Sequence, residues 1–176
     1  MTFTQRDLDY IRAHFVPLEE AVQQAIERGV LPRPSYVLPD GTQMVPADYL
    51  ALVDVRPSFE RRYLAAGGTP VELEEAWAGY MSGTYGVCLE QVTPETIVRK
   101  GILVDSLTAL LADPREDDVN WRDALRDQVE ELDRLERDFA PDYDRNVERF
   151  GRPPTRDLLI KGARERFPDV FASRVA

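Results

Sequence analysis

Residues 93–112, TPETIVRKGILVDSLTALLA, form the stretch that decides the fold. Thr93 followed by proline is typical of a helix start, because threonine caps the first amides and proline suits the first helical position. The apolar residues that follow are Ile97, Val98, Ile102, Leu103, Val104, Leu107, Leu110 and Leu111. They occupy much of the helix circumference, so we predict that this helix is the central and most buried one.

Two further amphipathic helices flank this central helix. Residues 69–72 have the spacing of a capping box and introduce an apolar stripe. After the central helix, apolar residues recur every three or four positions, which predicts a long helix over 120–139 with a charged outer face. On that face Asp133 and Arg137, four residues apart, are expected to form a surface ion pair.

The N-terminal part combines short helices with a proline-rich segment. Helical spacing predicts a short first helix capped by Thr4 and a second helix over 18–28. An Asp-Gly pair then lies between two short extended stretches, a pattern that favours a β-hairpin near 35–45. Pro46 is expected to begin another helix, because proline is favoured in a first turn.

Together these elements predict a mainly α protein, a helical bundle of about six to eight helices with one small β-hairpin. The chain has 176 residues, of which 43% are hydrophobic, and is long enough to bury one core. We therefore expect residues 1–176 to form a single domain. Gly67-Gly68 is the one position where the sequence suggests an internal boundary.

The composition argues against several classes of partner. The formal net charge is −10, so most of the surface would repel a nucleic-acid backbone or an anionic membrane. The predicted order of two helices followed by a hairpin is similar to that of a winged-helix transcription factor, but the net negative charge argues against DNA binding. Charges near the N-terminus are not typical of a signal peptide, and one cysteine cannot form an internal disulfide. We expect a cytoplasmic protein that binds neither nucleic acid nor membrane.

The sequence also lacks the motifs of common cofactor sites. His14 is the only histidine, which excludes a histidine-rich metal site. No phosphate-binding loop or dinucleotide-binding glycine pattern is present, and a partial match to a calcium loop after residue 141 lacks its glycine and its final glutamate. We predict neither a metal nor an organic cofactor.

The segment around Cys88 joins the two clearest helices and is where we expect a site. Cys88, the only cysteine, can act as a nucleophile if a base helps to form its thiolate, and His14 is the only imidazole available. Tyr85 is a further candidate catalytic residue. However, a free cysteine is more often a buried apolar residue, and Cys88 shares core spacing with Leu89 and Val92. Both interpretations stay open.

Candidate ligand-binding residues are Trp77, Tyr80 and Arg99. The two aromatic side chains could line a pocket near 77–92, although core packing explains them equally well. Lys100 could form a Schiff base if it were desolvated. Its position beside Arg99 in the first turns of a helix instead predicts an exposed side chain.

Three stretches of the sequence resemble a known family. They are LPRPSYVLPDGTQMVPADYL at 31–50, YMSGTYGVCLEQVTPETIVRKGILVDSL at 80–107 and FGRPPTRDLLI at 150–160. In these stretches the chain is similar to an uncharacterised family of small actinobacterial proteins labelled as natural-product biosynthesis proteins. The resemblance would cover nearly the whole chain and implies a setting in secondary metabolism. It carries over no catalytic residue, because the family has no assigned reaction.

Two functions remain as hypotheses. The first is a small-molecule enzyme or binding protein that acts on a biosynthetic intermediate, with a pocket near 77–92 closed by the hairpin. The second is a non-catalytic partner or regulatory protein that docks onto a biosynthetic enzyme through the hairpin or the helix over 120–139. The residues alone do not decide between catalysis and binding.

Overall fold

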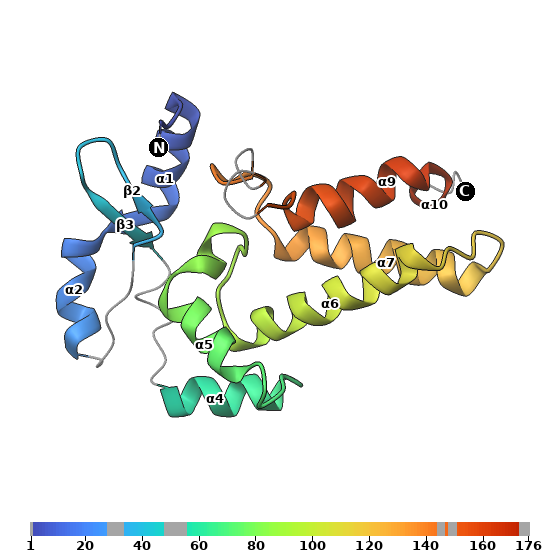
Figure 1. The fold of residues 1–176 in the computed structure, drawn as a ribbon, viewed down its shortest axis with the longest axis horizontal. Helices are drawn as coiled ribbons and strands as arrows, with labels where there is room; N and C mark the ends of the chain where they lie inside the picture. Colours follow the sequence, from blue (N-terminus) through green and yellow to red (C-terminus); the bar gives the residue numbers. More distant parts are fainter. Residues whose placement is uncertain (1, 28–33, 48–55, 144–146, 148–150, 173–176) are drawn as a thin grey trace.

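The computed structural model describes residues 2–27, 34–47, 56–143, 147 and 151–172. It confirms a mainly α fold with one small antiparallel sheet (Figure 1). The helices are α1 (Gln5–His14), α2 (Leu18–Glu27), α4 (Arg56–Ala65), α5 (Leu73–Met81), α6 (Pro94–Ala112), α7 (Val119–Leu135), α9 (Gly162–Arg166) and α10 (Pro168–Phe171). The 3-10 helix η1 (Thr84–Val87) and the π-helix η2 (Arg156–Lys161) are shorter. Within the described ranges, none of the helices combines the length and the apolar character needed to cross a bilayer.

The N-terminal layer is a three-stranded antiparallel sheet next to α1 and α2. Its strands β1 (Phe15–Pro17), β2 (Tyr36–Val37) and β3 (Gln43–Pro46) lie in the order β1-β3-β2. β2 and β3 form the predicted hairpin, with Tyr36 opposite Met44. Pro46 ends β3 opposite Phe15 and does not begin a helix, so that prediction is wrong. The rest of the helix expected there, at 48–55, lies outside the described residues.

Burial explains why the chain stays extended as far as the end of β3. Met44 and Val45 are 3% and 0% exposed, and Met44 packs with Ile11 and Phe15 in the N-terminal core. If the chain turned away from the strand one residue earlier, these contacts would be disturbed. The hairpin turn contains Gly41 at a φ of 87°, a left-handed conformation that favours glycine.

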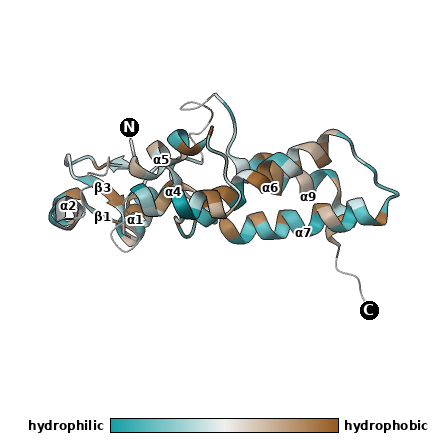
Figure 2. Cartoon of the chain, turned by 90° about the horizontal axis from the view of Figure 1, so that it is seen from below, coloured by the Kyte–Doolittle hydropathy of each residue, from teal (hydrophilic) through white to brown (hydrophobic). Residues whose placement is uncertain are grey.

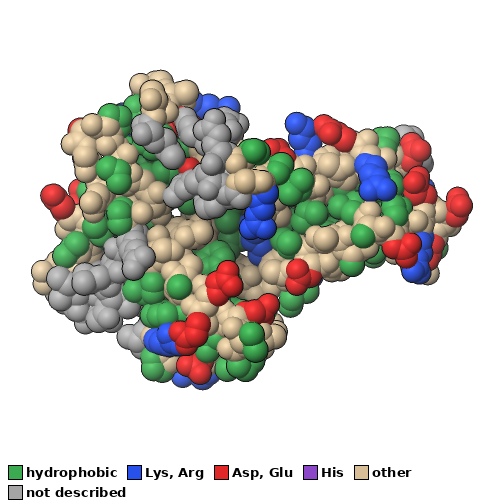
Figure 3. Space-filling model, viewed as in Figure 1, with side chains coloured by type: hydrophobic (Ala, Val, Ile, Leu, Met, Phe, Trp, Pro, Cys, Tyr) green, Lys and Arg blue, Asp and Glu red, His purple; other side chains and the backbone are tan. Residues whose placement is uncertain are grey.

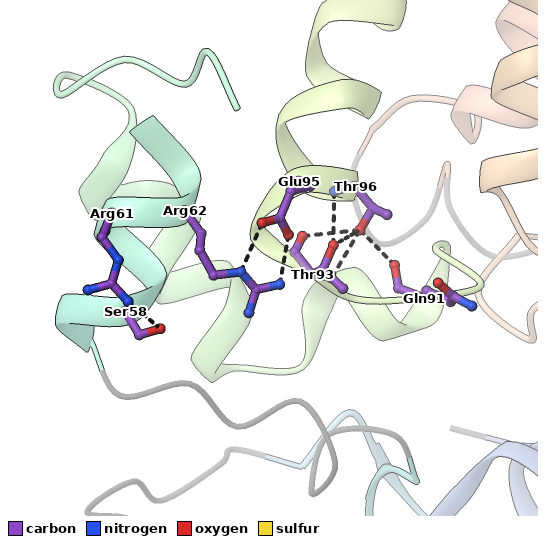
Figure 4. A network of polar contacts seen from close by, with 7 residues as sticks. All are labelled: Ser58, Arg61, Arg62, Gln91, Thr93, Glu95 and Thr96. Carbon is purple, nitrogen blue, oxygen red and sulfur yellow. Dashed lines mark hydrogen bonds and ion pairs between the residues drawn. The ribbon is translucent and has the colours of Figure 1, made fainter. Parts of the chain in front are cut away.

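Side-chain caps set the starts of α6 and α7, and the cap of α6 at Thr93 is the one predicted. Thr93 accepts a hydrogen bond from the amide of Thr96, and Asp118 accepts one from the first turn of α7. Figure 4 shows the Thr93 network beside the ion pair of Arg62 and Glu95, which links α4 to the start of α6. The first turn of α6 is thus fixed both to its own cap and to a neighbouring helix.

An aromatic core lies between α4, α5 and the first half of α6. Phe59, Tyr63 and Tyr80 are at most 5% exposed, and the ring of Phe59 stacks on Tyr63 and contacts Trp77 edge-on. The predicted apolar stripe of α5 packs here. The helix itself starts at Leu73, a turn later than the capping-box spacing predicts.

Helix α6 also contributes to a second core, formed with α7, η2, α9 and α10. Trp121, Leu125, Val129 and Leu132 of α7 are at most 5% exposed, which confirms the predicted stripe. Hydrophilic residues are visible along the other face of α7 (Figure 2). Because it packs in both cores, α6 is the central helix as predicted. It is not buried around its apolar circumference, because Ile102 is 45% exposed and Val104, Leu110 and Leu111 are only partly buried.

Candidate functional site

Helix α7 ends earlier than the sequence predicts, and this early end builds the site. Its last residue is Leu135, and Glu136 pairs with Leu89 in an isolated antiparallel bridge. The amide of Arg137 donates to the carbonyl of Cys88 at 2.8 Å. Glu136 and Arg137 are 2% and 5% exposed, so both charged residues are buried at this bridge.

Three side chains meet beside the bridge, and we call Cys88, Lys100 and Glu136 the thiol–lysine–carboxylate cluster. The Nζ atom of Lys100 lies 3.1 Å from the Sγ atom of Cys88 and 2.6 Å from Oε1 of Glu136. The side chain of Lys100 is 15% exposed and that of Glu136 is 1% exposed, while Cys88 is partly exposed. The prediction of an exposed Lys100 is therefore wrong, because a buried carboxylate distant in sequence compensates its charge.

The charges within the cluster keep Lys100 protonated. Burial lowers the pKa of a lysine, but the electrostatic and hydrogen-bond interactions with Cys88 and Glu136 outweigh burial, so the pKa of Lys100 is raised. An ammonium group is not a nucleophile and does not form a Schiff base. In this state Lys100 instead supplies a positive charge directly beside a sulfur atom.

Arg137 places a second cation next to the cluster. Its Nε atom donates to the carbonyl of Leu89 at 3.0 Å, and its Nη1 atom lies 3.0 Å from Nδ1 of His14. A carboxylate oxygen of Glu90 is 3.9 Å from the same guanidinium, but the side chain of Glu90 is 53% exposed. The guanidinium is thus held mainly by a carbonyl and an imidazole.

Each cation at the bridge has an anionic neighbour. Lys100 pairs with the buried carboxylate of Glu136, and Arg137 lies 3.9 Å from the half-exposed carboxylate of Glu90. The ammonium of Lys100 also lies 3.1 Å from the sulfur of Cys88. Figure 3 shows Lys and Arg side chains in the hollow between the two halves of the molecule, where α7 ends. The charge pattern therefore favours thiol chemistry at this position.

Three partly buried tyrosines, Tyr10, Tyr85 and Tyr143, lie near the cluster. The ring of Tyr10 lies 4.5 Å from that of His14, and the hydroxyl of Tyr143 donates to the carbonyl of Arg137 at 3.1 Å. Burial raises the pKa of Tyr10 and of Tyr85 to about 12, and it raises the pKa of Tyr143 as well. These hydroxyls stay protonated at neutral pH, so they are not general bases in the unliganded chain.

The structure brings the predicted catalytic residues into one region but gives them different partners. His14 contacts Arg137 through its ring, whereas the sulfur of Cys88 contacts Lys100. Tyr85 has its carbonyl 3.5 Å from that sulfur. The catalytic roles of these residues stay predictions, and Lys100 takes the position that we expected His14 to occupy.

The predicted ligand-binding residues lie in two different settings. Trp77 and Tyr80 stack on each other in the aromatic core, and Tyr80 is 1% exposed. Arg99 forms a surface ion pair with Glu131 of α7. Each has a packing or ion-pairing role, and ligand binding by them stays a prediction.

A pocket of about 450 Å³ lies beside the segment that follows α7. It is lined by Tyr143 and Phe139 and by charged residues of η2 and α9, but by none of the residues 77–92. Arg156 of this lining donates to the carbonyl of Glu136 at 3.4 Å, so the pocket wall touches the turn that carries the buried carboxylate. Arg156 also begins the π-helix η2, and π-helical turns are rare and frequent at functional sites.

Sequence reasoning missed Glu136 as a site residue and placed Lys100 and Arg137 at the surface. The apolar spacing continues through Leu135 to Phe139 without a glycine or proline, so nothing local indicates that α7 ends where it does. The expected surface pair of Asp133 with Arg137 is wrong, because Asp133 pairs with Arg156 and Arg164. The usable signal was a lysine, one of two in the chain, on a helix that is apolar around most of its circumference.

Within the described residues, no group of three or more His, Cys, Asp or Glu side chains is arranged to hold a metal ion. The chemistry that the cluster offers is a sulfur nucleophile with an adjacent ammonium and a buried carboxylate.

Comparison with known proteins gives one match. No curated protein and no solved structure is significantly similar to the chain. The model of a family of unknown function, DUF6058, matches residues 58–168. This range contains Cys88, Lys100, Glu136 and Arg137, whereas His14 and the N-terminal sheet precede it. Since the match covers more than half of the sequence, the chain belongs to the DUF6058 family.

Proposed function

We propose that this chain transforms a small biosynthetic intermediate by accepting its electrophilic acyl group on Cys88. The observation that supports the proposal is the 3.1 Å contact between Sγ of Cys88 and Nζ of Lys100. A cysteine reacts as its thiolate, and an adjacent cation stabilises that form at neutral pH. The setting in secondary metabolism is the one that the sequence resemblance implies.

The proposed reaction uses the cluster in three steps. The thiolate of Cys88 attacks the carbonyl carbon of an activated acyl group, the leaving group departs, and a thioester remains on the sulfur. Lys100 stabilises the thiolate before the attack through its ammonium group. Glu136 is a positioning residue, because its buried carboxylate holds that ammonium 2.6 Å away. A second nucleophile then takes the acyl group and returns the thiolate.

The neighbouring pocket suits the body of such a substrate. Its volume of about 450 Å³ is within the usual range for small-molecule sites. Phe139 and Tyr143 offer apolar surface, and Arg156 offers a cation for an acidic substituent. The cytoplasm, as expected from the single cysteine, is a reducing compartment that keeps Cys88 in the reactive form.

The test uses p-nitrophenyl acetate as a simple activated ester, in reducing buffer at neutral pH. We expect release of p-nitrophenolate together with an acetyl adduct that peptide mass spectrometry assigns to Cys88. Lys100→Met should slow acetylation several-fold, because the thiolate loses its cation. Cys88→Ser should give no thioester.

Arg99→Met is the matched control, since Arg99 is the neighbouring residue on α6 and pairs at the surface with Glu131. Its acetylation rate should equal that of the wild type. Acetylation that appears only after unfolding, or that does not depend on Lys100, would contradict the proposed function.

A further inference from the structure

We infer that Cys88 and Lys100 form an oxidative cross-link, a covalent bond between Sγ and Nζ that a hydroperoxide induces. Two observations carry the inference. The two atoms are already 3.1 Å apart, and the carboxylate of Glu136 lies beside the lysine to take up its proton. The inference goes beyond the proposed function, because it requires only this proximity and no substrate.

The reaction proceeds in two balanced steps. The thiolate of Cys88 first attacks the hydroperoxide, the O–O bond breaks, and sulfur is oxidised by two electrons to a sulfenic acid. The departing alkoxide or hydroxide takes a proton from solvent, so the peroxide is reduced to an alcohol or water. The amine of Lys100 then attacks the sulfur, the S–OH bond breaks, an S–N bond forms, and water leaves. Sulfenic acids are known to condense with nitrogen nucleophiles in this way.

The change of charge on oxidation activates the lysine. A thiolate beside Lys100 holds its proton in place, but a sulfenic acid carries no charge and releases this constraint. The buried carboxylate of Glu136 is then the adjacent acceptor for the proton. Its Oε2 atom has no hydrogen-bond partner within the part of the chain that the structure describes, so it has capacity for the proton.

The chain has no second thiol that could react with the sulfenic acid of Cys88. Cys88 is the only cysteine, so no internal disulfide can form. The backbone on both sides is held, because the carbonyl of Cys88 accepts from Arg137 and the amide of Leu89 bonds to the carbonyl of Tyr85. Bond formation therefore needs only a small movement of the flexible lysine stem.

The test treats the reduced full-length chain with hydrogen peroxide and follows its intact mass. We expect a decrease by the mass of two hydrogen atoms, a linked peptide pair that contains Cys88 and Lys100, and recovery of the original mass with dithiothreitol. Oxidation of Cys88 only to the sulfinic or sulfonic acid, or only to a disulfide between two chains, would overturn the inference.

Two lysine variants serve as matched controls. Lys100→Arg keeps a cation opposite Glu136 but has no primary amine, so the cross-link should be lost and a sulfenic acid should be trapped by dimedone. Lys161→Arg changes the other lysine, whose side chain is 66% exposed, and should cross-link like the wild type. The opposite pattern in the two variants would refute the assignment. Acetylation by the ester is measured without peroxide, so the two proposals fail separately.

Discussion

The ammonium of Lys100 and the carboxylate of Glu136 form an ion pair at 2.6 Å that joins the first half of α6 to the residue after α7. The carboxylate side chain is 1% exposed. A buried pair of this kind adds little net stability, because both charges lose their hydration. Removing one partner is costly, however, since the other charge then stays buried without compensation. The pair thus specifies how the two helices meet.

We predict that Lys100→Met lowers the free energy of unfolding by about 3 kcal/mol, because it leaves Glu136 unpaired. Urea denaturation measures the loss. The double variant Lys100→Met/Glu136→Gln should recover most of it, since neither charge of this pair then remains. A double variant as unstable as the single one would show that the lysine contributes through its packing.

The packing of α7 gives a second prediction. Trp121→Ala and Leu132→Ala should each cost about 2–5 kcal/mol, because both side chains are at most 5% exposed in the core shared with α6. Ile102→Ala is the control on α6, and its 45% exposure predicts a loss below about 1 kcal/mol. Equal losses at all three positions in urea denaturation would contradict the packing described for α7.

Local rules predicted the elements whose ends are marked by local chemistry. Thr93 with Pro94 marks the start of α6, and an Asp-Gly turn marks the hairpin. β1 carries no such mark. It is a three-residue strand that forms because Phe15 and its neighbours pair with β3, which lies far along the chain from them.

The site depended on contacts that no local pattern reveals. Its carboxylate is buried because Glu136 pairs with Leu89, and its lysine is buried because that carboxylate is there. Periodicity correctly predicted burial at Leu89 and Val92, which are 0% and 6% exposed. The same periodicity placed Glu136 on a solvated helix face, because a helical pattern carries no information about pairing between distant segments.

Gly86 gives a third prediction, about the contact between η1 and the sheet. A Cβ atom at this position would lie 2.4 Å from Cγ of Pro46, so Gly86→Ala should destabilise the chain by about 1–3 kcal/mol. Gly101→Ala is the matched control. Beyond the adjacent residues and the nearby backbone of α6, no described atom lies within 4 Å of its Cβ position, and alanine should stabilise the helix by about 0.8 kcal/mol. Thermal unfolding of both variants tests the opposite signs.

The ion pair of Glu95 with Arg62 predicts a dependence of stability on pH. The hydrogen bonds from Arg62 lower the pKa of Glu95 from 4.5 to about 2. The pair therefore contributes stability above pH 4.5, and this contribution is lost as the pH falls towards 2. The side chains are 37% and 49% exposed, so screening limits the contribution to about 0.5 kcal/mol.

Comparison with Glu95→Gln isolates this effect. The difference in unfolding free energy between wild type and variant should shrink between pH 4.5 and 2 and also with added salt. A difference that grows as the pH falls would contradict the assigned direction of the pKa shift.

The last prediction concerns the rate at which iodoacetamide alkylates Cys88 at neutral pH, where three interpretations give different results. A sulfur paired with Lys100 should react faster than free glutathione, and Lys100→Met should slow the reaction. His14→Ala should leave the rate unchanged, because the ring of His14 lies against Arg137 and Tyr10, whereas the sulfur contacts Lys100. If His14→Ala slows alkylation and Lys100→Met does not, the histidine is the activating base. If the native chain reacts slowly and only unfolding exposes the thiol, Cys88 is a structural apolar residue, and the proposed acyl transfer must be abandoned.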